Sequence, residues 1–80
     1  KLSRQALRQH KIHAQEAEKA VGVKEAEIAK LEAQMADPSL YSDAQKSADV
    51  QRAYQKAQQA LQTLYEQWEA AEAALSQEEA

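Results

Sequence analysis

Two long runs of residues with heptad spacing, separated by a single proline, constrain what this chain can fold into. Steps of three and four residues keep the recurring side chains on one side of a helix, and this spacing is typical of a coiled coil. The first run comprises Leu7, His10, Ala14, Ala17, Val21, Lys24, Ile28, Leu31 and Met35, and the second comprises Val50, Tyr54, Ala57, Leu61, Leu64, Trp68, Ala71 and Leu75.

Pro38 lies between the two runs and divides the chain into two helices. Proline is excluded from a helix interior, and the residue before it resists helical backbone angles. Asp37 is expected to cap a short turn that has Pro38 at its first position. The predicted bounds are a first helix over about 3–36, a turn over about 37–42 and a second helix over about 43–78.

Residues suited to capping stand at the start of both predicted helices. Ser3 precedes the first heptad run, and its hydroxyl is expected to cap the first helix. The segment Ser42-Asp43-Ala44-Gln45 fits a capping box in which Ser42 caps the second helix. At the turn itself, Leu40 and Tyr41 are expected either to plug the end of the apolar seam, which we favour, or to form an exposed tip.

A connection this short makes the two helices antiparallel neighbours. Pairing residues whose numbers sum to about 85 places every a position against a d position, with Ala17 facing Trp68 and Leu31 facing Tyr54. Along one flank, the same register places Arg4 opposite Glu79 and Lys11 opposite Glu72. The fold class predicted from the sequence is therefore all-α, an antiparallel two-helix coiled-coil hairpin.

Composition supports one domain over residues 1–80. The chain has one glycine, one proline and no cysteine, and its formal net charge is −3. Such a composition is typical of long helices, and it excludes disulfides and thiolate metal sites. The lack of cysteine favours a cytoplasmic location, and no apolar run approaches the ~20 residues that cross a bilayer. Because the chain begins at Lys1 without a methionine, we expect it to be a fragment of a larger protein.

Charge is segregated along the chain, which suggests a nucleic-acid-binding site. The first thirteen residues have four cations and no acid, and residues 66–80 have five glutamates and no base. A basic stripe on one helix face can follow phosphates, although the acidic end could neutralise it. The candidate contacts are Lys1, Arg4, Arg8 and Lys11, and a second, more diluted set near the turn comprises Lys46, Arg52 and Lys56.

No catalytic or metal-binding pattern stands out. His10 and His13 lack further ligands for a metal site, and Glu66, Glu69 and Glu72 lack a pocket that would shift a carboxyl pKa. We expect no enzyme activity and no cofactor in this fragment. The alternative function is structural, because a smooth surface for a third helix is offered by Ala6, Ala20, Ala53, Ala60 and Ala74. The isolated chain is expected to be a monomer.

Two segments resemble a known family. The run from Leu31 to Asp43, with Asp-Pro-Ser-Leu-Tyr at the turn, and the later Tyr65-Glu66-Gln67-Trp68-Glu69 resemble the C-terminal coiled-coil domain of ABC-F ATP-binding-cassette proteins of the Uup type. The opening Lys1-Leu2-Ser3 resembles the start of that domain. The resemblance covers nearly the whole chain.

The resemblance implies a larger parent protein with two ATP-binding cassettes and no membrane domain. The cassettes of that parent would hydrolyse ATP with magnesium, and this tail would not. In Uup-like members the tail is associated with DNA binding and supports the activity of the parent, whereas other members of the wider family act on ribosomes. Expected partners are therefore DNA or another nucleic acid, bound weakly and without sequence preference, the parent cassettes and the ribosome.

Overall fold

Two long helices and a short connecting turn form the whole of the described structure. The computed structural model describes residues 3–79, and side chains as far as Gln77. Helix α1 spans Arg4–Ala36, the 3-10 helix η1 spans Pro38–Ser42, and α2 spans Ala44–Glu79. No strand occurs in residues 3–79. The predicted all-α hairpin is therefore confirmed.

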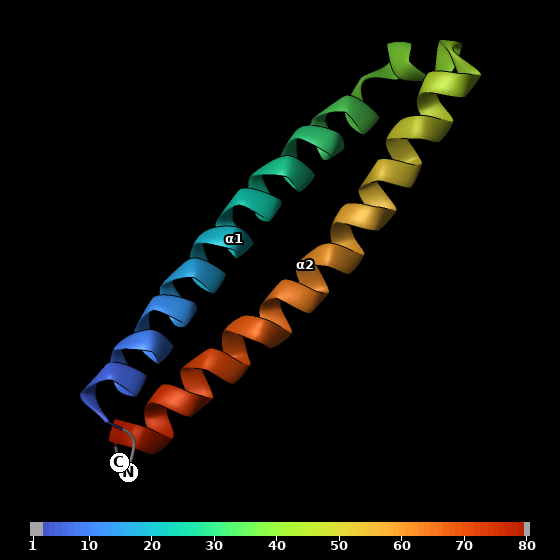
Figure 1. The fold of residues 1–80 in the computed structure, drawn as a ribbon. Helices are drawn as coiled ribbons and strands as arrows, with labels where there is room; N and C mark the ends of the chain where they lie inside the picture. The colour runs from blue at the N-terminus through green and yellow to red at the C-terminus, as the bar shows by residue number, and fades with distance from the viewer. Residues whose placement is uncertain (1–2, 80) are drawn as a thin grey trace.

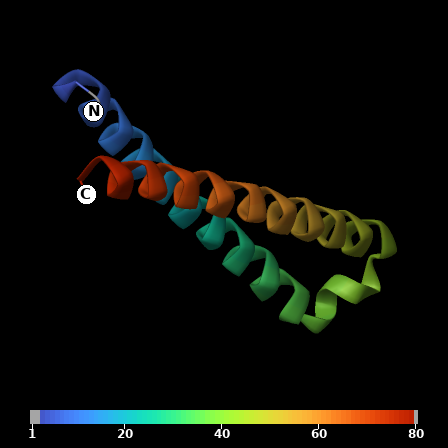
Figure 2. The ribbon, with the colours of Figure 1, turned by 90° about the horizontal axis from the view of Figure 1, so that it is seen from below.

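The helices lie side by side and run in opposite directions (Figure 1). The start of α1 and the end of α2 meet at one end of the molecule, and η1 closes the other end. Figure 2, turned by 90°, shows the two ribbons crossing, as expected for helices that wrap around each other. The molecule is a thin rod with extents of 59 × 16 × 14 Å.

Helix α1 begins and ends where local chemistry requires it. The Ser3 hydroxyl accepts a hydrogen bond from the backbone N–H of Ala6 at 3.2 Å and so satisfies one free donor of the first turn. After Ala36 the backbone of Asp37 is extended, with φ −82° and ψ 116°, as the following proline favours. The Asp37 carboxylate then accepts from the N–H of Ser39 at 3.0 Å and caps η1, as predicted.

The cap of α2 differs from the prediction. Asp43, and not Ser42, precedes the first helical residue, and its carboxylate accepts from the backbone N–H of Lys46 at 3.0 Å. The Ser42 hydroxyl instead donates to the carbonyl oxygen of Ser39 at 2.7 Å. Ser42 is occupied because η1 extends to it, and the next residue with a carboxylate takes over the capping role.

The core is the predicted heptad seam, and it is narrow. Every residue of the two runs is at least partly buried. The most buried seam residues are Ala14, Val21, Ile28 and Ala57, which are 4–9% exposed. Ser47, which extends the second run toward the turn, is equally buried and was missed by the sequence analysis. Its hydroxyl accepts from the Gln51 amide at 3.3 Å, which satisfies the buried oxygen.

The turn closes the seam with one apolar side chain. Leu40 is only 6% exposed and covers the end of the seam, as the favoured prediction required. Tyr41 does not join it, because its ring is 55% exposed and its hydroxyl donates to the carbonyl oxygen of Met35 at 2.7 Å. That bond satisfies a carbonyl in the last turn of α1, so Tyr41 stabilises the helix end from outside.

Candidate nucleic-acid interface

The predicted basic stripe lies on the first two turns of α1. Arg4, Arg8 and Lys11 are exposed, and with Leu7 they line a surface groove of about 240 Å³. Steps of four and three residues place the three cations on one side of the helix, so their side chains converge on the groove. Lys1, the fourth predicted contact, lies outside the described residues.

The expected pairing of this stripe with the acidic end of α2 is absent where both side chains are described. Lys11 and Glu72 form no ion pair, and the Glu72 carboxylate accepts instead from the indole N–H of Trp68 at 3.2 Å. Within residues 3–77 the ion pairs are Lys24–Glu27 and Arg52–Asp49, and each lies within one helix. Arg8 and Lys11 thus have no ion-pair partner among the described side chains, whereas the predicted pairing of Arg4 with Glu79 lies outside them.

Side-chain direction explains why the predicted pair does not form. Helical side chains lean toward the N-terminus of their own helix. In an antiparallel hairpin, Lys11 and Glu72 therefore lean away from each other. Flank residues that are offset from each other in the other direction along the rod lean toward each other. Glu25 and Tyr65 are such a pair, and they form a hydrogen bond.

Two tyrosines on this flank bind glutamates of α1 across the interface. The hydroxyl of Tyr65 donates to the Glu25 carboxylate at 2.6 Å, and that of Tyr54 donates to the Glu32 carboxylate at 3.2 Å. The Tyr54 bond places it beside Leu31, its predicted partner. The hydrogen bond to Glu25 raises the pKa of Tyr65, and desolvation followed by the charge of Glu32 raises the pKa of Tyr54. We call this side of the hairpin the tyrosine flank.

The opposite side, which we call the alanine flank, is open. A groove of about 310 Å³ runs between α1 and α2 on that side. Its floor is apolar and its rim contains few charges, because small residues occupy most of the positions beside the seam. The residues that line it are His13, Glu16, Ala17, Ala20, Leu64, Gln67 and Ala71.

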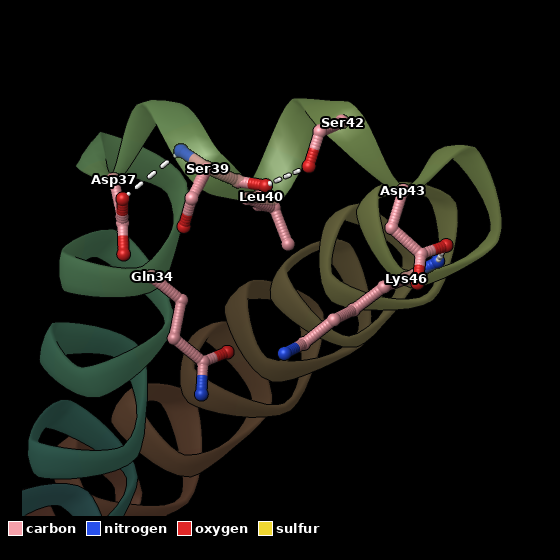
Figure 3. Close-up of a pocket in the computed structure, with 7 residues that line it drawn as sticks. All are labelled: Gln34, Asp37, Ser39, Leu40, Ser42, Asp43 and Lys46. Atoms are coloured by element: carbon pink, nitrogen blue, oxygen red, sulfur yellow. Dashed lines mark hydrogen bonds between the residues drawn. The ribbon is translucent and has the colours of Figure 1, made fainter.

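The tip of the hairpin contains a third hollow, but its charge is mixed. Figure 3 shows Lys46 extending from α2 toward Gln34 of α1, with Asp37 and Asp43 on either side of the turn. The hydrogen bond from the backbone N–H of Ser39 lowers the pKa of Asp37. The carboxylates of Asp37 and Asp43 are both charged at neutral pH. Two acids therefore accompany Lys46, and Arg52, another member of the second basic set, is held by Asp49 at 3.5 Å. The tip is a weaker site for an anion than the stripe on α1.

The structure defines a class of domain, a two-helix antiparallel coiled coil with a basic stripe at its open end. None of the helices in the described residues has an apolar stretch long enough to span a bilayer. The profile of the ABC transporter C-terminal domain family matches residues 1–73, and the chain belongs to that family. No curated protein and no solved structure matches the chain.

Proposed function

We propose that this chain is a nucleic-acid-binding C-terminal domain, with DNA preferred, of a soluble ABC-F protein of the Uup type. Membership in the ABC transporter C-terminal domain family supports the position of the domain in such a protein. The parent is a cytoplasmic ATPase whose cassettes use ATP with magnesium. For the domain itself we propose binding without catalysis and without a cofactor.

The observation behind this proposal is the exposed cluster of Arg4, Arg8 and Lys11 around one groove. Each cation that meets a phosphate releases counterions, and this release supplies most of the sequence-independent affinity for a nucleic acid. With Lys1 included, the stripe offers two to four such contacts. The expected binding is weak, indifferent to sequence and sensitive to salt.

The test is a titration of the chain with duplex DNA, single-stranded DNA and structured RNA at several salt concentrations. For duplex DNA the log–log slope of affinity against salt is expected between about −2 and −4, at ~0.9 per phosphate contact. Replacing Arg4, Arg8 and Lys11 with glutamine should weaken binding and flatten the slope by about 2 to 3.

The matched control is the triple glutamine variant of Lys46, Arg52 and Lys56, which removes the same charge near the turn. It should change the affinity less, because Asp37, Asp43 and Asp49 already neutralise that region. Equal effects of the two triple variants would show that total charge, and not the stripe, governs binding. Binding that survives in the α1 variant but not in the control would move the contact to the tip.

A second candidate function is structural, and the groove on the alanine flank favours it. In that case the hairpin packs on the cassettes of the parent or on the ribosome. If the chain binds none of the three nucleic acids at low salt, the structural function replaces the nucleic-acid-binding function.

A further inference from the structure

The alanine flank continues along α1 beyond the groove and contains an exposed valine. Val23 is 62% exposed, more than Ile12 or Tyr41, the other large apolar side chains that are well exposed in residues 3–77. It lies three residues after Ala20 and seven after Glu16, both of which line the groove. Val23 therefore stands on the same side of α1, just beyond the groove in the direction of the turn.

A single exposed valine is common on a protein surface, but the surface area of this molecule adds a second observation. The chain exposes 6052 Å². A compact protein of 8.9 kDa exposes about 4,800 Å². The difference exceeds the ~800 Å² that each partner buries in a standard protein interface. This excess belongs to the thin rod as a whole, both flanks included, and it is larger than the area that one partner needs.

Charge along the same line of α1 indicates which partner fits. Glu16, Val23 and Lys30 recur every seven residues, so they stand in a row at intervals of about 10.5 Å. Glu16 and Lys30 are both exposed, and neither has an ion-pair partner among the described side chains. An acid and a base at equal distances on either side of a valine form a self-complementary pattern.

We propose that the alanine flank binds a second copy of this chain in an antiparallel dimer centred on Val23. A twofold axis through Val23, perpendicular to α1, places the two valines against each other. It also places each Glu16 against the partner's Lys30, and an interface of this symmetry contains both pairs. The groove beside Ala20 lets the second α1 approach closely. This dimer does not depend on nucleic-acid binding, and it replaces the monomer expected from the sequence.

Sedimentation equilibrium of the 80-residue chain over a wide concentration range tests the proposal. A reversible monomer–dimer equilibrium is expected. Val23→Glu should raise the dissociation constant about tenfold or more, because it removes a buried valine contact and sets two like charges at the axis. Ala29→Glu is the matched control, since it adds the same charge at an exposed position of α1 on the other flank, and it should leave the constant unchanged. Circular dichroism verifies that both variants remain helical.

A charge exchange distinguishes this geometry from any other self-association. Glu16→Lys alone and Lys30→Glu alone should each weaken the dimer by setting like charges opposite each other, and the double variant should restore it. A chain that is monomeric at all concentrations overturns the proposal. The proposal is also overturned if Val23→Glu does not weaken the association, or if neither single charge variant weakens it. Binding of a different protein to this flank, with no binding of a second copy, overturns it as well.

Discussion

Gly22 provides a direct test of how much local helix preference contributes to a hairpin with so thin a core. It lies inside α1, its backbone has ordinary helical angles, and a Cβ built on it meets no atom within 4 Å. Gly22→Ala therefore introduces neither a clash nor backbone strain. Helix α1 continues through Gly22 without interruption.

The expected gain is the difference in helix propensity between glycine and alanine, about 1 kcal/mol in the free energy of unfolding. For a domain of this size, that gain corresponds to a rise in Tm of about 4–8 °C. Far-UV circular dichroism during thermal and urea denaturation measures both quantities.

Ala29→Gly is the matched reverse substitution. Ala29 is exposed, lies in the same helix and occupies the same heptad position one repeat later. It should lower the stability by a similar amount, and the double variant should be close to the parent chain. A Gly22→Ala variant that is less stable than the parent would refute this reasoning, since the glycine would then be required for a bend or a close contact.

Caps and polar flank contacts give further expectations. Asp43→Ala should lower the free energy of unfolding by about 1 kcal/mol, and Asp43→Asn should preserve it. Thermal denaturation measures both changes. If Ser42→Ala lowered the Tm more than Asp43→Ala, the assignment of Asp43 as the cap would be wrong. Because its pKa is raised above 10.0, the proton on Tyr65 stabilises the native state below that pH, and this contribution is lost as pH rises through the raised value. Tyr65→Phe should therefore reduce the loss of helicity during alkaline titration. The pKa of Asp37 is lowered from 3.8, so the charged carboxylate stabilises the native state above that pH, and this stabilisation is lost as pH falls through the lowered value. Asp37→Asn should therefore make the free energy of unfolding depend less on pH during acid titration.

The fold could be predicted because its determinants are periodic and local. Heptad spacing identifies the buried side of each helix without knowledge of the partner, and Pro38 fixes where the chain must turn. The interhelical bond from Tyr54 to Glu32 lies next to the predicted Leu31–Tyr54 layer. Ser47 also follows the heptad spacing, so extending the second run by one step would have found it.

The flank contacts could not be predicted in the same way, because they depend on side-chain direction. Heptad spacing places Lys11 and Glu72 on the same flank, but it does not give the direction in which their side chains lean. The Glu72 carboxylate accepts from Trp68 of its own helix instead. The prediction that Ser42 caps α2 was wrong because Ser42 and Asp43 are both residue types that cap helices well. Only the extent of η1 selects Asp43.

The two flanks of this hairpin differ in chemistry, which makes the two proposed interactions separable. The tyrosine flank joins α1 to α2 through Tyr54 and Tyr65, and the basic groove at Arg4, Leu7, Arg8 and Lys11 occupies the open end of α1. The proposed dimer uses the row from Glu16 to Lys30, which begins beyond that groove. Val23→Glu should therefore leave the salt slope of binding to a short duplex unchanged. A dimer with two basic grooves should bind a long duplex more tightly than a monomer does. Measuring the affinity for a short and a long duplex separates the two effects. If Val23→Glu weakened binding to the short duplex as much as to the long one, the row on α1 would belong to the nucleic-acid contact, and the division between the two surfaces would be wrong.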